Sequence, residues 1–189
     1  IGVRLVGSEM CIRDRLRAAI PNSVRVTNAN QCVEFLPIAG GGNYIGELPD
    51  VNNNAAAQST INTGGYQVTF GSARYVYVAA LSSTEIYSGS AVSTTVSGVE
   101  DHSDNTLSLS AAHQFLRNSV SNRFFLADNP AAFCVVANEL RYFSNYATPS
   151  TTTGVPGGVG SLMAQGVASN GSPFTLCLLY TSDAADEED

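Results

Sequence analysis

The sequence predicts a mostly β fold of the α+β class, in which an antiparallel-rich sheet follows a short helix near the start of the chain. The 189 residues include 17 Gly, 8 Tyr and 8 Phe, and Ser, Thr, Asn and Val are also abundant. Apolar, β-branched segments alternate with turn residues along most of the chain, a pattern typical of strands. The length suits one domain of ordinary size with a real core.

The first predicted element is the end of a helix at Leu16–Ile20, which Pro21 stops because proline cannot continue an interior helical turn. A hairpin then follows around the turn-forming segment Asn28–Asn30. The other strands are separated by polar turns, such as 100–105 and Asp128–Pro130. The predicted strands are Ser23–Thr27, Gln31–Leu36, Tyr66–Phe70, Arg74–Leu81, Val92–Val99, Thr106–Ser110, Arg123–Ala127, Ala132–Ala137, Leu140–Ser144 and Phe174–Leu176.

Three segments are predicted to lack strands. The glycines Gly40–Gly42 are expected to break the chain, and Asp50–Gly65 is expected to be a long loop with one helical turn at most. The low-complexity stretch Thr148–Gly160 is expected to be a mobile surface loop. Arg74–Leu81 stands apart from the other strands, since both of its faces are apolar and it should be covered on both sides.

The two ends of the chain look like translated sequencing adapters. Leu5–Arg15 reads LVGSEMCIRDR and Cys177–Asp186 reads CLLYTSDAAD, as the two transposase adapters of a DNA library would when read in frame. We therefore expect residues 1–15 and 177–189 to be adapter-derived, and residues 16–176 to be one globular head from an environmental DNA read. The alternative is a helix with a cysteine at the start and an acidic tail at the end.

The charge depends strongly on these ends. The formal net charge of the whole chain is −7, and all nine basic residues are Arg. Residues 16–176 contain nine acids and six arginines, which leaves −3. A chain without a basic face is a poor nucleic-acid binder, so no nucleic-acid partner is expected. No apolar run reaches the ~18 residues that a membrane span needs.

Two of the four cysteines, Cys32 and Cys134, lie between the expected adapter segments. Each sits in an apolar, β-branched run, so each is expected on a strand. Two buried free thiols and one disulfide are both compatible with this pattern.

No pattern of catalytic or cofactor-binding residues is found, so an enzyme is not expected and no cofactor is predicted. His102 and His113 have no metal-ligand partner at a suitable spacing, and 100–104 lacks the oxygen pattern of a calcium loop. No G-x-S-x-G or phosphate-binding motif is present, although serines are too numerous to exclude a Ser-His-Asp triad. Three tyrosines, if exposed, could stack on sugars, but tyrosines on strands are more often packing residues. They are Tyr44, Tyr66 and Tyr87.

Residues 16–37 resemble the minor pilins of the mannose-sensitive haemagglutinin (MSHA) pilus, of the O-subunit type, within the family that undergoes prepilin-type cleavage and methylation. The resemblance is carried by Ala19-Ile20-Pro21-Asn22-Ser23 and by Cys32-Val33-Glu34-Phe35-Leu36-Pro37. Later segments support it: Ser121-Asn122-Arg123-Phe124-Phe125-Leu126, Phe133-Cys134-Val135-Val136 and Leu140-Arg141-Tyr142. The family's leader peptide, its Phe-Thr-Leu-Ile-Glu start, its anchoring helix and its last strands have no counterpart here.

The resemblance implies a type IV pilin-like head, truncated at both ends, that helps to assemble or cap a pilus used in cell adhesion. Its partners would be other minor and major pilins, and the missing helix would anchor it in the inner membrane of a Gram-negative bacterium. The head would be periplasmic and later part of the fimbrium. An extracytoplasmic place favours a disulfide between Cys32 and Cys134, with Cα atoms about 4.4–6.8 Å apart.

Two other functions remain open. A minor pseudopilin of a type II secretion system shares the anchor and the plan of the head, and neighbouring genes would distinguish it. An extracytoplasmic carbohydrate-binding β-domain belongs to a different class of protein.

Overall fold

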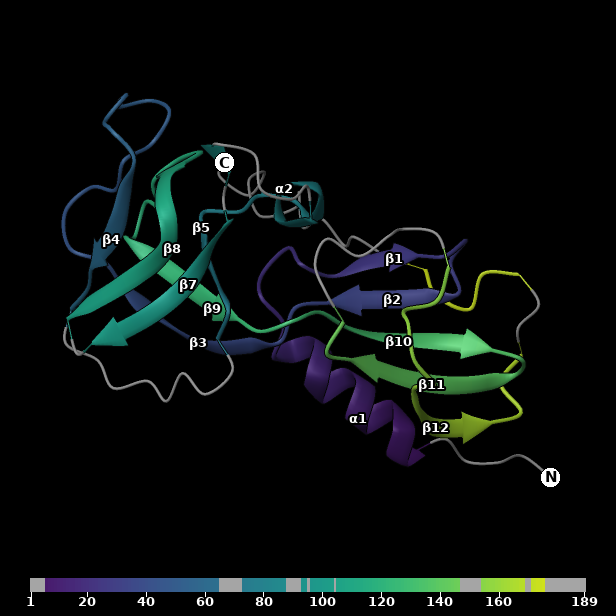
Figure 1. The fold of residues 1–189 in the computed structure, drawn as a ribbon. Helices are drawn as coiled ribbons and strands as arrows, with labels where there is room; N and C mark the ends of the chain where they lie inside the picture. Colours follow the sequence, from purple (N-terminus) through teal and green to yellow (C-terminus); the bar gives the residue numbers. More distant parts are fainter. Residues whose placement is uncertain are drawn as a thin grey trace, which may run out of the picture.

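The computed structural model describes residues 6–64, 73–87, 93–94, 96–103, 105–146, 154–168 and 171–175. The described chain is mostly β and its strands are paired almost entirely antiparallel, in two sheets that lie side by side (Figure 1). The chain passes from one sheet to the other between β2 and β3 and again between β9 and β10. The second sheet is therefore built from one continuous stretch of the chain, inserted between β2 and β10 of the first sheet.

The first sheet has five strands in the order β1-β2-β10-β11-β12, and each neighbouring pair is antiparallel. Helix α1 (Val6–Arg17) lies across one face of this sheet (Figure 1) and packs on it through Ile12 and Leu16. The strands are β1 (Arg25–Thr27), β2 (Cys32–Phe35), β10 (Ala131–Val136), β11 (Glu139–Ser144) and β12 (Ser161–Gln165).

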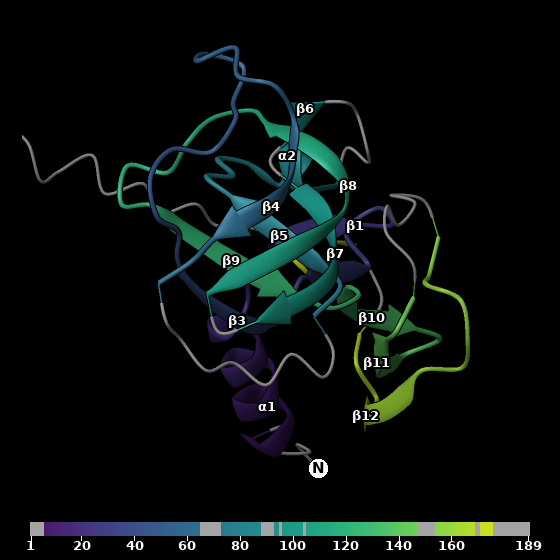
Figure 2. The ribbon, with the colours of Figure 1, turned by 60° about the vertical axis from the view of Figure 1, so that its left-hand side comes forward.

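The second sheet is strongly curled, as Figure 2 shows, and its path runs β3-β9-β5-β7-β8-β4. An antiparallel bridge between Tyr44 and Thr63 joins the chain just after β3 to the chain just after β4, so the two ends of the path meet. The strands are β3 (Ile38–Asn43), β4 (Gln58–Asn62), β5 (Tyr75–Val78), β7 (Val96–Ser103), β8 (Thr106–Phe115) and β9 (Arg123–Ala127), with β6 (Ser93–Thr94) pairing parallel to β8.

Apolar side chains from almost every strand fill the inside of the curled sheet. Val76 and Val78 of β5 and Phe124 and Leu126 of β9 are at most 1% exposed. β5 lies between β9 and β7, and Tyr77 is also buried, on the opposite face. The prediction that this strand is covered on both sides is confirmed.

A separate apolar cluster joins the two sheets. It combines Ile20 and Leu36 from the first sheet's side with Tyr77 of β5 and with Ile86 and Tyr87 of the short helix α2 (Ser83–Tyr87). All five side chains are at most 5% exposed. Because both sheets contribute to this cluster, they share a core and are held together as one body.

The predicted hairpin around Asn28–Asn30 is confirmed, and β10 and β11 form a second hairpin. β1 and β2 pair across residues 28–31, and β10 and β11 pair across Ala137 and Asn138. Ala137 and Asn138 have φ of 50° and 64°, the left-handed pair that a two-residue type I′ turn requires. The hairpin of β7 and β8 is also confirmed, with Ser103 opposite Thr106, so the turn is shorter than predicted.

The prediction that Gly40–Gly42 breaks the chain is wrong. These glycines form the middle of β3, where they pair with Leu126, Phe125 and Phe124 of β9. A Cβ atom on Gly41 would lie 2.8 Å from the carbonyl oxygen of Phe124, so the close approach of the two backbones requires glycine here.

Two further strands were not expected from the sequence, and one expected strand is missing. β4 lies within the predicted loop Asp50–Gly65, and β12 follows the low-complexity stretch. Residues 171–175 form no strand, contrary to the one predicted at Phe174–Leu176. Helix α1 ends at Arg17, earlier than expected, because Ala19 and Ile20 already bond to the chain at 36–37.

Several expectations lie outside the described residues: the strand Tyr66–Phe70, residues 148–153 of the loop Thr148–Gly160, Leu176, and the segments 1–5 and 177–189. Within the described chain, neither helix combines the length and the apolar character needed to cross a bilayer.

Candidate functional site

The strand β2 carries the residues that the sequence singled out, Cys32-Val33-Glu34-Phe35, and all four side chains are at most 5% exposed. Successive residues on a strand point to opposite faces. Val33 and Phe35 join the cluster beneath α1, whereas Cys32 belongs to a cluster on the other face. The motif therefore forms the centre of the first sheet.

Cys32 and Cys134 form a disulfide that links β2 to β10 directly across the sheet. Their Cα atoms are 4.1 Å apart, slightly closer than the range expected from sequence. The neighbouring pair explains this distance, because the amide of Val135 donates to the carbonyl of Gln31 at 2.8 Å. Cys32 and Cys134 therefore form a non-hydrogen-bonded pair of the antiparallel ladder. Opposite residues approach most closely in pairs of this kind. The disulfide closes a loop of 102 residues that contains nearly all of the second sheet.

A buried ion pair lies on the same face of the sheet as the disulfide. Arg25 of β1 stands opposite Glu34 of β2, and its Nε donates to Glu34 Oε2 at 2.6 Å. Only 3% of the Glu34 side chain and 14% of the Arg25 side chain are exposed. The hydroxyl of Tyr146 donates to the other carboxylate oxygen at 2.8 Å. Both oxygens of this buried carboxylate are therefore satisfied, as a buried charge requires.

Tyr87 of α2 completes this polar cluster from the side of the second sheet. Its ring lies beneath the guanidinium of Arg25, 3.6 Å from the centroid, and its hydroxyl donates to the carbonyl of Ser23 at 3.0 Å. Burial raises the pKa of Tyr87, and burial together with the Glu34 carboxylate raises the pKa of Tyr146. Both phenols therefore stay protonated and act as donors. We call Arg25, Glu34, Tyr87 and Tyr146 the buried polar cluster.

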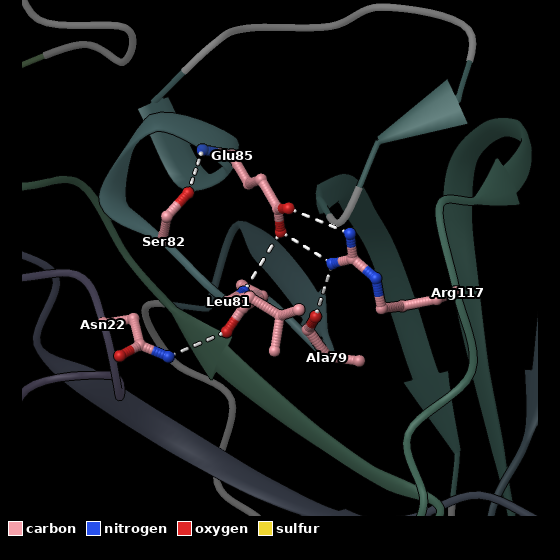
Figure 3. Close-up of polar contacts among 7 residues, drawn as sticks. Asn22, Ala79, Leu81, Ser82, Glu85 and Arg117 are labelled. Carbon is pink, nitrogen blue, oxygen red and sulfur yellow. Dashed lines mark hydrogen bonds and ion pairs between the residues drawn. The ribbon is translucent and has the colours of Figure 1, made fainter. Parts of the chain in front are cut away.

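A second ion pair holds α2 in position (Figure 3). Arg117, which follows β8, donates from both terminal nitrogens to the Glu85 carboxylate at 2.7 and 2.9 Å and also to the carbonyl of Ala79 at 3.0 Å. The amide of Leu81 donates to the same carboxylate at 3.0 Å. The Arg117 guanidinium and the Leu81 amide both lower the pKa of Glu85. Ser82 caps the helix by accepting from the amide of Glu85, in the spacing of a capping box.

The structure contradicts the hypothesis that Tyr44 and Tyr87 are exposed sugar-stacking residues. They are only 2% and 5% exposed, and the hydroxyl of Tyr44 bonds to Asn118 within the core of the curled sheet. Tyr66 lies outside the described residues. His113 packs edge-on against Phe115, and of His102 only the backbone in β7 is described. Among the described residues, no group of three or more His, Cys, Asp or Glu side chains could hold a metal ion.

The segment 6–15, expected to be adapter-derived, contacts the first sheet through Ile12 and Arg15. Ile12 is half-buried in the cluster beneath α1, and the guanidinium of Arg15 lies 4.0 Å from the centre of the Tyr142 ring. Cys11, Arg13 and Asp14 have largely exposed side chains, and Cys11 is a free thiol.

Sequence analysis missed most of the buried polar cluster and the ion pair of α2. Arg25 and Glu34 flank the four-residue turn 28–31 at equal distances, so a hairpin with that turn length pairs them. The spacing of Ser82 and Glu85 is also a visible helix-start signal. Tyr146 and Arg117 had no such local signal, because their partners lie far away in the chain.

No protein-family model, no curated protein and no solved structure matches this chain.

Proposed function

We propose that this chain is the globular head of a structural minor pilin, of the MSHA pilus type, which acts outside the cytoplasm through contacts with other pilin subunits. The observation that carries the proposal is the role of Cys32-Val33-Glu34-Phe35, the segment with the most specific resemblance to that family. Every residue of the segment is buried in the first sheet, and each has a distinct structural partner.

The chemistry of the site supports a structural role. The Glu34 carboxylate is closed off by Arg25 and Tyr146, and a carboxylate held in this way cannot serve as an accessible acid or base. The disulfide is fully buried and stabilises a fold, and stable disulfides of this kind are typical of oxidising compartments.

The proposal is tested by sequencing the genomic DNA on both sides of the coding region. Genes for a major pilin, a pilus assembly ATPase and a prepilin peptidase close to this gene are the expected result. Genes of a type II secretion system would assign the head to a pseudopilin instead, and a neighbourhood without pilin-like genes would overturn the proposal.

A second test uses the complete gene, tagged and expressed in its host. Mechanical shearing of the cells should release the tagged protein together with the major pilin. A tagged protein that stays with the cytoplasmic fraction, while the major pilin is released, would contradict the proposal.

A further inference from the structure

A cleft of about 260 Å³ lies at the junction of the two sheets. Two crossing segments form its walls: Pro37 with Ile38 at the start of β3, and Asp128 with Asn129 between β9 and β10. The end of β11 closes it with Tyr142, Ser144 and Asn145. Junctions between structural units are places where ligand sites often occur. The cleft lies apart from the buried polar cluster, with which it shares no residue.

The lining of the cleft combines polar groups of different hydrogen-bonding capacity. Asn129 and Asn145 each offer a donor and an acceptor, Ser144 offers a hydroxyl, and Asp128 is an acceptor. Among the described residues, the side chains of Asn129, Ser144 and Asn145 make no hydrogen bond with one another or with the rest of the described chain. Ser144 and Asn145 are exposed. These groups are therefore available to a ligand.

The charge in the cleft is already balanced. Arg74 pairs with Asp128, with its Nε 3.1 Å from the Oδ1 atom. That oxygen is buried and makes no hydrogen bond among the described residues, so the contact with Arg74 is an ion pair without hydrogen-bond alignment. A ligand with a full charge of either sign would have to break or crowd this pair. The cleft therefore favours a neutral ligand.

An apolar wall faces these polar groups. Pro37, Ile38, Ala39 and Ala131 line it, and Ile38 is 40% exposed, unusually open for an isoleucine. The Tyr142 ring has only one face left for stacking on a ligand, because the guanidinium of Arg15 lies over the other. The volume is below the roughly 300–1,000 Å³ of sites for drug-sized ligands. A single small ring with one apolar face and several hydroxyl groups matches these properties.

We propose that this cleft binds one neutral sugar ring, which lays its C–H face on Ile38 and Pro37 and exchanges hydrogen bonds with Asp128, Asn129, Ser144 and Asn145. The inference stands independently of the proposed structural function. A pilin head with or without this site would still assemble, and a sugar-binding head need not be a pilin.

The experiment titrates the purified full chain with glucose, galactose, mannose, N-acetylglucosamine and, as a charged comparison, glucuronate, and follows saturation-transfer NMR signals. At least one neutral sugar should bind saturably at millimolar concentration. Ser144→Ala and Asn129→Ala each remove one hydrogen bond from an open lining residue, and together they should weaken binding by about tenfold or more. Asp128→Asn, which keeps the shape, should also weaken it.

Two matched variants serve as controls. Ser110→Ala on β8 and Asn52→Ala in the turn after Asp50 remove the same groups from exposed positions outside the cleft, and should leave binding unchanged. Thermal unfolding of each variant verifies that it is folded. The proposal is overturned if no neutral sugar binds, if the cleft variants bind like the controls, or if glucuronate binds more tightly than every neutral sugar.

Discussion

The residue whose environment is most unusual is Glu34, a carboxylate that is almost fully buried and held by Arg25 and Tyr146. Removing one partner of a buried pair is costly, because the other charge remains away from water without compensation. A buried pair need not add net stability compared with apolar residues of the same shape. Its value here lies in the register that it enforces between β1 and β2.

Glu34→Gln should lower the free energy of unfolding by about 3 kcal/mol, because it leaves the Arg25 guanidinium buried without its counter-charge. Chemical denaturation of the variant measures this loss. Glu139→Gln is the matched control, since Glu139 also pairs with an arginine, Arg141, but with about a quarter of each side chain exposed. Its loss should be much smaller. Equal losses in the two variants would contradict the special cost of the buried pair.

The lowered pKa of Glu85 predicts that this residue contributes to stability in a pH-dependent way. Its folded-state pKa is lowered by Arg117, so the pair stabilises the fold at pH values above the ordinary range of a glutamate. This stabilisation is lost as the pH falls through the folded pKa, below 4.5. The thermal midpoint of Glu85→Gln should therefore lie below that of the unchanged protein at pH 7, and the gap should narrow as the pH falls below 4.5. A gap that stays constant down to acid unfolding would contradict this assignment.

Among the individual strands, β3 depends on its glycines for close pairing with β9. Gly41→Ala should destabilise the protein, because the added Cβ would meet the carbonyl oxygen of Phe124, a backbone atom that cannot move away cheaply. Gly157→Ala is the control, since nothing lies within 4 Å of its added Cβ. The difference between the two thermal midpoints measures the effect. Equal midpoints would show that β3 and β9 can separate at this position without cost.

The expected adapter origin of residues 1–15, which form most of helix α1, predicts that they add little to the stability of the fold. Removing residues 1–15 and 177–189 takes away the half-buried Ile12 and the Arg15 contact, worth about 1–2 kcal/mol together. The thermal midpoint of the shortened chain should fall by only about 2–8 °C. The loss of a cooperative transition would mean that these segments are integral to the fold, contrary to their expected origin in adapters.

Strand positions with local signals were predictable, and those with non-local causes were not. The hairpins of β1 with β2 and of β10 with β11 follow from Asn-containing turns between apolar runs. β3 could not be predicted, because its glycines lack side chains and its formation depends on β9, about 85 residues away in sequence. β4 consists mainly of polar residues and is fixed by its partner β8. Tertiary pairing overrides local preference in both strands.

The division of the strands into two sheets belongs to the whole molecule, and no sequence pattern indicated it. Asp128–Pro130 was expected to be a turn, but it forms a bend that leads from the curled sheet into the first sheet and does not close a hairpin. The cleft forms where this segment lies beside the other connection between the sheets, at 36–38. Its residues therefore come from separate parts of the chain. Only a three-dimensional arrangement brings them together.

The disulfide acts at the same scale, since it ties the two strands through which the chain leaves and re-enters the first sheet. Closing a loop of this size restricts the unfolded chain by about 4–5 kcal/mol in the chain-entropy model. Cys134→Ser should therefore cost several kcal/mol of unfolding free energy, measured by denaturation without reductant. An unchanged midpoint would mean that the bond contributes nothing to the stability of the folded head.

The central claim is that this is a disulfide-linked head that works outside the cytoplasm, and the state of Cys32 and Cys134 tests it most directly. The measurement is mass spectrometry of protein expressed in a bacterial periplasm, with Cys11 and Cys177 replaced by serine. The expected result is a mass about 2 Da below that of the reduced chain, no alkylation after denaturation without reductant, and one cross-linked pair of tryptic peptides, 26–74 with 124–141. Two alkylated thiols in the unreduced protein would contradict it.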